Sequence, residues 1–267
     1  MGSLIVTLLS DFGLRDSYVA EVKAAILEVC RNVILVDITH EVERHNVRMG
    51  AYFLARSAKI FPEGTVHLAV VDPGVGSGRR PIVIEGERAY FVGPDNGLLA
   101  LAAREQVVRH VYKIENTAFL RRQISDTFHG RDVFAPVAGH LAAGIKPSAF
   151  GPEIFDYQVP KFSEAEVHGC HIIGEIIHID NFGNIVTNIT PRHLSEGGVR
   201  LNSEVKVTVS DGGSEKMRLR ETYSNVAPGC FLAVVGSGGF LEVSINQGDA
   251  ARQLRAAASK RVEVALI

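Results

Sequence analysis

The sequence predicts an α/β amino-terminal domain, with a mixed and mostly parallel sheet, followed by a smaller, barrel-like all-β domain. Three observations lead to this prediction. Strand-like and helix-like patterns alternate up to about residue 155, which is typical of a sheet flanked by helices. A proline and a polar stretch interrupt the periodicity near 155–168. Beyond this point, short strand-like runs alternate with turns rich in glycine, asparagine and serine, which favours a small barrel.

The amino-terminal elements follow from the spacing of apolar residues. A strand at Leu4–Leu9 comes first, and Asp16 or Ser17 then suits the N-cap of a helix. The uninterrupted apolar run Val33–Val36 indicates a strand that is buried on both faces, as in a sheet covered by helices. The other expected elements are a helix with an apolar face from Val22 to Val29, a helix from Val47 to Ala58, a strand at Val66–Val71, a hairpin of Ile82–Ile84 with Ala89–Val92, and a helix at Leu98–Arg104.

The predicted domains span residues 1–160 and 168–267, and a linker at 161–167 joins them. Within the second domain the expected strands are short and their connections are polar, so little room is left for long helices. The expected elements there are strands at Glu175–Ile179, Val205–Val209, Phe231–Val235 and Val262–Ile267, and short helices around Pro191–Glu196 and Asp249–Ala258.

Composition excludes several classes of protein. Of the 267 residues, 46% are apolar and 22% charged, which argues against disorder. A formal charge of −2 indicates no basic surface for a nucleic acid or a membrane, so a small molecule is the expected partner. No signal-peptide or membrane-helix pattern is found, and the expected location is the cytoplasm. The well-separated Cys30, Cys170 and Cys230 are expected as free thiols. His168 and His171 lack an acidic partner at metal-ligand spacing, so no metal site is expected.

The segment Ser10–Gly13 follows the first strand, at the sheet edge where open α/β folds bind their ligands. The carboxylate of Asp11 offers two acceptor oxygens, which suits the 2′,3′-diol of a ribose. Asp16 and Ser17 follow in the same loop. The alternative is purely local, with Asp11 stabilising a turn and Ser17 capping a helix.

A glycine-rich loop from Asp72 to Arg80 follows the strand that ends at Val71. It resembles the loop of methyltransferases that use S-adenosyl-L-methionine (SAM). That loop approaches its ligand at the start of a helix, whereas the next segment here, Pro81–Ile84, is strand-like, so a methyltransferase is disfavoured. The loop combines one acid with the guanidinium groups of Arg79 and Arg80, which favours a site over the alternative of a turn with a surface salt bridge.

Two further loops carry candidate residues. The segment Thr127–Asp132 places His129 ahead of a helix that has Pro136 in its first turn. A histidine can accept or deliver a proton near neutral pH, although a structural, hydrogen-bonded histidine is the alternative. The turn Asp180–Asn184 gathers polar groups around Phe182 that could hold an amino acid and stack a base. An ordinary asparagine-rich turn is the alternative.

Taken together and in this order, these segments resemble the SAM hydrolases, also called SAM hydroxide adenosyltransferases, which are relatives of the fluorinases and chlorinases. The resemblance covers essentially the whole chain. It implies hydrolysis of SAM to adenosine and L-methionine by direct attack of water at the ribose 5′ carbon, with no cofactor. The motifs that carry it are Ser10–Gly13, Phe61–Val66, Val71–Gly76, Gly93–Leu98, Thr127–Asp132, His140–Gly144 and Asp180–Asn184.

The resemblance also implies roles for single residues. An acid, arginine and histidine triad falls on Asp72, Arg79 and His129, and would hold and activate the attacking water. It further implies a homotrimer, in which the α/β domain of one subunit and the β-domain of its neighbour close each site. The implied substrate contacts are Asp11 for the ribose, Asp16, Ser17, Asp180 and Ser237 for the methionine end, Phe182 and Asn184 for the adenine, and Phe128 and Gly130 on either side of the triad histidine.

The resemblance favours water over halide as the nucleophile, because neither the fluorinases nor the chlorinases share the set of Asp72, Arg79 and His129. The fluorinases carry an insertion after the acidic loop, whereas this chain runs directly from Arg80 into the next strand. Gly130 stands where the fluorinase has a serine that helps to desolvate fluoride, whereas the chlorinase also has glycine there. His45 stands where the fluorinase has an aromatic residue. A SAM-dependent halogenase of the same fold and a non-catalytic SAM sensor stay open as alternatives. The sequence also leaves open whether Asp72 or His129 is the base.

Overall fold

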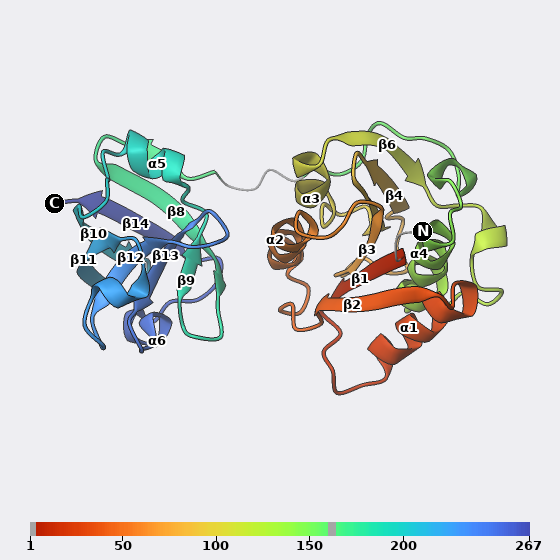
Figure 1. Ribbon diagram of the computed structural model, residues 1–267, viewed down its shortest axis with the longest axis horizontal. Helices are drawn as coiled ribbons and strands as arrows, with labels where there is room; N and C mark the ends of the chain where they lie inside the picture. The colour runs from red at the N-terminus through yellow and green to blue at the C-terminus, as the bar shows by residue number, and fades with distance from the viewer. Residues whose placement is uncertain (1–3, 160–163) are drawn as a thin grey trace. The chain divides into compact units, whose positions relative to one another are not determined.

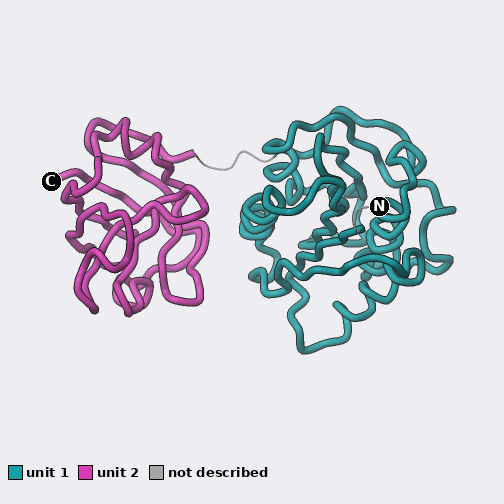
Figure 2. Tube along the Cα trace, viewed as in Figure 1, with its two compact units in different colours: residues 1–160 teal, residues 161–267 magenta. Residues whose placement is uncertain are grey.

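The structure is a computed structural model that describes residues 4–159 and 164–267. The chain divides into two compact units, residues 1–160 and 161–267 (Figure 2). Among the described residues, no helix is long and apolar enough to cross a membrane.

The first unit is an α/β domain built on a six-stranded sheet in the order β2-β1-β3-β5-β4-β6 (Figure 1). Strands β2, β1, β3 and β5 are parallel, and β4 runs antiparallel between β5 and β6. The predicted fold class, a mixed and mostly parallel sheet flanked by helices, is confirmed. The strands are β1 (Leu4–Ser10), β2 (Val33–Thr39), β3 (Thr65–Val70), β4 (Pro81–Gly86), β5 (Ala89–Pro94) and β6 (Val108–Lys113). The helices are α1 (Tyr18–Val29), α2 (Val47–Ala58), α3 (Ala100–Glu105) and α4 (Ala135–Ala142), with single turns η1 (Thr117–Phe119), η2 (Gly130–Phe134) and η3 (Pro147–Ala149).

Helices cover both faces of this sheet, which explains why the inner strands β1, β3, β4 and β5 are mostly buried, whereas the edge strands β2 and β6 are not. Side chains alternate between the two faces of a strand. Along β1, Val6 and Leu8 are buried in a core shared with α1 and α4, whereas Leu9 is buried in a second core with α2 and α3. The central strand β3 is buried at every position.

The starts of the helices differ in detail from the sequence-based expectations. Ser17 occupies the N-cap position of α1, but its hydroxyl donates to Glu21 and caps no backbone N–H. Asn46 caps α2 by accepting from the backbone N–H of Met49 at 3.0 Å. His129 precedes the π-helical turn η2, which leads into α4, so this histidine lies one turn before the α-helix that carries Pro136.

The second unit is a β-barrel, as predicted. Strand β8 pairs with β9 on one side and β14 on the other, so seven strands in the order β8-β14-β10-β11-β12-β13-β9 close on themselves, while β7 adds to β8. The strands are β7 (Glu166–His168), β8 (His171–Ile179), β9 (Ile185–Thr187), β10 (Glu204–Val209), β11 (Ser214–Arg220), β12 (Phe231–Val235), β13 (Leu241–Ile245) and β14 (Arg261–Leu266). The helices are α5 (Pro191–Glu196), α6 (Ala250–Leu254) and the single turn η4 (Tyr223–Asn225).

Two boundaries in this region differ from the expected ones. The segment expected as a linker, 161–167, lies partly outside the described residues, and its last two residues belong to β7. Helix α6 is shorter than expected, because Arg255 adopts a left-handed conformation with φ of 51° and ends the helix after about one turn.

Candidate active site

The parallel pairing of β1 with β3 brings two candidate loops together. Ser10, the last residue of β1, pairs in register with Val70, the last residue of β3. The loops that carry Asp11 and Asp72 therefore leave the same edge of the sheet side by side. This edge is the carboxyl end of the parallel strands, where open α/β sheets bind their ligands.

Asp72, Arg79 and His129 form one hydrogen-bonded unit. The guanidinium of Arg79 grips the carboxylate of Asp72 with two nitrogens, Nε donating to Oδ1 at 2.9 Å and Nη2 donating to Oδ2. The same Nη2 lies 2.9 Å from Nδ1 of His129. The side chains of Asp72 and Arg79 are only 6% and 10% exposed, and the guanidinium lies 5.1 Å from the ring centre of Phe134. The structure thus brings together three residues that are up to 57 positions apart in the chain (129 − 72 = 57).

The contact with Arg79 fixes the protonation of His129. An arginine side chain has donors only, so Nδ1 of His129 must accept, and the proton of the neutral imidazole then lies on Nε2. Burial lowers the pKa of His129, the positive charge of Arg79 lowers it further, and the charge of Asp72 opposes both. His129 is therefore neutral at pH 7, with Nδ1 occupied and Nε2 available as a donor.

A cavity of about 210 Å³ lies beside this triad. Asp11 lines it, and its Oδ2 accepts a hydrogen bond of 2.9 Å from the backbone N–H of His45. His45 itself has a positive φ of 65°. Because a carboxylate has about four lone-pair directions, Asp11 keeps capacity for further donors. The cavity is lined by Asp11, Phe12, His45, Val70, Asp72, Val75, Thr127, Phe128, His129 and Gly130.

Two glycines are required by close packing around this cavity. Gly76 has a φ of +76°, and a Cβ there would lie 2.7 Å from the carbonyl oxygen of Asp126. The glycine-rich loop 72–80 therefore rests against the loop that carries His129. At Gly130 a Cβ would lie 3.1 Å from Cζ of Phe12 and 3.4 Å from Cε2 of Phe128. These two rings form an edge-to-face pair with centroids 5.8 Å apart. A larger residue at position 130 would have to displace Phe12.

The remaining predicted site residues of the first unit, Asp16 and Ser17, are exposed in the loop before α1 and do not line the cavity. Those of the second unit lie in two turns. Asp180 organises the turn between β8 and β9, because its carboxylate accepts from the backbone N–H groups of Phe182 and Asn184 and from the Asn184 side chain, each at 2.9 Å. Asn184 is buried, whereas Phe182 is 79% exposed. Ser237 lies in a different turn, between β12 and β13.

The structure also shows a serine, histidine and aspartate chain that the sequence analysis missed. The Ser10 hydroxyl lies 2.7 Å from Nδ1 of His40, and Nε2 of His40 lies 3.1 Å from the Asp37 carboxylate. Ser10 is only 2% exposed and also accepts from the N–H of Phe12 at 3.3 Å, so it cannot reach a substrate as a nucleophile. These contacts of Ser10, His40 and Asp37 instead anchor the start of the loop that carries Asp11. No local motif signals these contacts, because Ser10 ends β1 whereas His40 follows the end of β2.

Other missed residues are Phe12, Val75 and Thr127, which line the cavity, and Phe134, which supports Arg79. All but Phe134 adjoin or fall within motifs identified from the sequence. Across residues 4–159 and 164–267, no three His, Cys, Asp or Glu side chains are arranged to hold a metal ion.

Comparison with known proteins gives consistent results over both units. Residues 6–151 match the family model described as SAM hydroxide adenosyltransferase N-terminal domain, and residues 174–263 match the model of the C-terminal domain. A Thermus thermophilus protein named (R)-S-adenosyl-L-methionine hydrolase is 38% identical over 256 residues, which cover 93% of this chain and 94% of that protein. A Nocardia brasiliensis fluorinase is 28% identical over 290 residues, which cover 97% of each. A solved structure from Thermotoga maritima, 37% identical, superposes with a TM-score of 0.92 over 97% of this chain and 99% of that one.

We predict that Gly76→Ala lowers both stability and turnover, whereas Gly78→Ala changes neither. A side chain at a positive φ costs roughly 1–2 kcal/mol, and the added methyl group would also meet the Asp126 carbonyl. Gly78 is in the same loop and has open space around it, so its substitution should stay within about 0.5 kcal/mol. Urea unfolding and steady-state kinetics check both variants. Equal behaviour of the two would show that the contact between the loops is dispensable.

Proposed function

The chain belongs to the SAM hydroxide adenosyltransferase family, and we propose that it hydrolyses SAM to adenosine and L-methionine by direct attack of water at the ribose 5′ carbon. The observation that carries the proposal is the unit of Asp72, Arg79 and His129 beside a cavity that Asp11 also lines. Relatives named as SAM hydrolases support the same reaction.

The cavity matches the reacting end of the substrate. Its volume of about 210 Å³ is below the roughly 300–1,000 Å³ of sites that enclose a drug-sized ligand, so we assign it to the ribose and the water. Asp11 then accepts from the ribose hydroxyls, while Phe128 and Gly130 form the wall beside the 5′ carbon. The apolar rings of Phe12 and Phe128 keep bulk water away from that carbon.

The family resemblance supports the assignment of the other ends of SAM. We assign Asp16, Ser17, Asp180 and Ser237 to the methionine end and Phe182 and Asn184 to the adenine. The highly exposed ring of Phe182 suits stacking on a base.

The resemblance likewise supports a homotrimer with sites at its subunit interfaces. Three unpaired cysteine thiols fit a protein of the reducing cytoplasm.

The chemistry follows from the charges that change during the reaction. As water attacks, the oxygen to 5′ carbon bond forms and the carbon to sulfur bond breaks, and its electron pair neutralises the sulfonium to give the thioether of methionine. The attacking oxygen becomes strongly acidic as this bond forms, so a carboxylate paired with arginine is basic enough to take its proton. The leaving group is neutral and needs no protonation. SAM is the substrate, and the proposed reaction uses no cofactor.

We assign different roles to Asp72 and His129. Nδ1 of His129 accepts from Arg79, so the Nε2–H can only donate, and we assign it to orienting the water through one oxygen lone pair. Asp72 accepts the proton. Because Arg79 holds both carboxylate oxygens of Asp72, this group is a poor candidate for a covalent nucleophile.

The proposed reaction predicts the product and its stereochemistry. With SAM made chiral by deuterium at the 5′ carbon, and with oxygen-18 water, we expect adenosine that is inverted at this carbon and carries one label. A single displacement inverts the carbon, whereas two displacements through an enzyme ester would retain its configuration. Mass spectrometry and NMR of the nucleoside check both points. A 5′-halogenated nucleoside formed in chloride or fluoride buffer would establish the halogenase instead, and binding without turnover would establish the sensor.

Another prediction separates the roles within the triad. Asp72→Asn keeps the shape of the side chain but removes the proton acceptor, and should lower kcat by about 10²–10⁴-fold with a smaller change in KM. His129→Gln should lower kcat less, because an amide N–H can replace the donated hydrogen bond. The opposite ranking in steady-state kinetics would make His129 the base.

The pH profile is the control for this comparison. Neutral His129 is present above its lowered pKa, and it is lost as the pH falls through that value, where a proton on Nδ1 would oppose Arg79. In the wild type, kcat/KM should therefore hold constant down to the ordinary histidine value of 6.5 and fall only below it. His129→Gln should lack this acid-side fall.

A further inference from the structure

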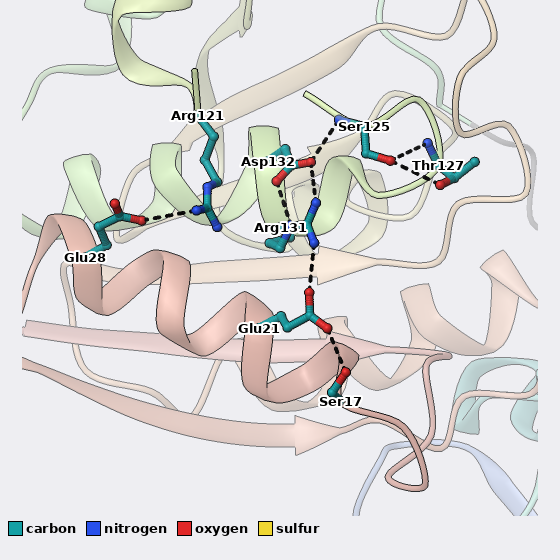
Figure 3. A network of polar contacts seen from close by, with 8 residues as sticks. All are labelled: Ser17, Glu21, Glu28, Arg121, Ser125, Thr127, Arg131 and Asp132. Carbon is teal, nitrogen blue, oxygen red and sulfur yellow. Dashed lines mark hydrogen bonds and ion pairs between the residues drawn. The ribbon is translucent and has the colours of Figure 1, made fainter. Parts of the chain in front are cut away.

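We propose that Glu21, Arg131 and Asp132 form a positioning cluster (Figure 3). The cluster holds the turn at Ser17, before α1, in a fixed position relative to the His129 loop, residues 125–132. This inference rests on the proposed function, because both segments are assigned there to substrate and water. The three residues of the cluster have no assigned contact with the substrate or the water.

Arg131 is the centre of the cluster and uses three nitrogens in hydrogen bonds. Nε and Nη2 grip the Asp132 carboxylate at 2.7 and 2.9 Å, and Nη1 donates to Oε2 of Glu21 at 2.8 Å. Figure 3 shows the guanidinium between the two carboxylates, one from α1 and one from η2. Such forked contacts fix an arginine in one orientation, which a lysine could not reproduce.

Asp132 closes the loop that carries His129. Its side chain is 1% exposed, and its Oδ2 accepts from the backbone N–H of Ser125 at 2.9 Å. Burial alone would raise the pKa of Asp132, but the hydrogen bonds from Arg131 and Ser125 outweigh it and lower the pKa, so the carboxylate stays charged. The two ends of the segment 125–132 are thus tied together, and the residues 127–130 between them line the 210 Å³ cavity.

Arg131 also acts on the cavity wall. Its guanidinium lies 4.9 Å from the ring centre of Phe128, and the ring of Tyr18 meets the same Phe128 ring edge to face at 5.3 Å. A cation over an aromatic face is attractive by roughly 0.5–2 kcal/mol. Phe128 immediately precedes His129, so any rotation of Arg131 would move the wall and the triad histidine together.

Glu21 extends the cluster to the methionine side of the site. While Oε2 accepts from Arg131, Oε1 accepts from the Ser17 hydroxyl at 2.7 Å, so one carboxylate connects the two segments. The hydrogen bonds from Ser17 and Arg131 lower the pKa of Glu21. None of Glu21, Arg131 and Asp132 lines the 210 Å³ cavity; all three border a separate cavity of about 830 Å³. Their role is therefore to position other residues.

The same helix offers a matched control. Glu28, two turns after Glu21 on α1, pairs with Arg121 at 3.7 Å, and these side chains are 69% and 40% exposed. Figure 3 shows this pair apart from the Arg131 cluster. An exposed ion pair of this length contributes little. Glu28→Ala removes the same charge from the same helix without touching Ser17 or the His129 loop.

The test compares the wild type, Glu21→Ala and Glu28→Ala in two measurements. In SAM hydrolysis we expect Glu21→Ala to lower kcat at least tenfold and to raise KM, because both segments lose their anchor, and Glu28→Ala to stay within twofold. In hydrogen exchange followed by mass spectrometry, we expect Glu21→Ala to speed exchange in the segment 125–132 while strands β1 and β3 keep wild-type protection. Arg131→Lys should resemble Glu21→Ala, and Glu21→Gln, which keeps an acceptor for Arg131, should fall between Glu21→Ala and the wild type.

Two results would overturn the inference. One is a Glu21→Ala variant that matches Glu28→Ala in both kinetics and exchange. The other is faster exchange spread evenly over the whole first unit, which would mean general destabilisation. Hydrogen exchange does not depend on the reaction, so a wild type that fails to hydrolyse SAM would refute the proposed function while the exchange comparison still tests the cluster.

Discussion

The double contact of Arg79 is the interaction on which the rest of the site depends. One guanidinium holds the Asp72 carboxylate by two nitrogens and also donates to Nδ1 of His129. Because arginine has no acceptor and keeps its charge, this contact decides the orientation of both partners and the tautomer of the histidine. In the proposed reaction, this contact gives a carboxylate and an imidazole that would otherwise be interchangeable as bases different roles, one as proton acceptor and the other as hydrogen-bond donor.

The fold makes this contact possible by packing three loops against a rigid sheet edge. The register of β1 with β3 sets the Asp11 loop beside the Asp72 loop, and the close approach at Gly76 seats the acidic loop on the histidine loop. Phe134, fully buried, supports the guanidinium from the helical side. Loops on a packed scaffold are a common location for catalytic groups, because the scaffold supplies precision while the loops supply polar atoms.

Much of the fold could be predicted from the sequence, because it is encoded in local periodicity. The run Val33–Val36 indicates a strand, which the structure confirms as β2, but the expected burial on both faces is wrong. Strand β2 lies at the edge of the sheet, none of its seven positions is buried, and Ile34 is 49% exposed. The candidate site residues came from motif spacing and family resemblance. The contacts between them could not be predicted: the bond between Glu21 and Arg131 joins side chains 110 positions apart, and no local pattern records such a pairing. The contacts of Asp180, by contrast, are local, because its carboxylate accepts hydrogen bonds from residues of its own turn.

The most direct test of this account is the tautomer of His129, measured by nitrogen-15 NMR of protein labelled in its histidine rings. At pH 7 the account predicts a neutral ring with the proton on Nε2 and an unprotonated, hydrogen-bonded Nδ1, and Arg79→Ala should remove the preference between the two nitrogens. A proton on Nδ1, or a charged imidazolium at pH 7, would contradict it, because neither can accept a hydrogen bond from Arg79.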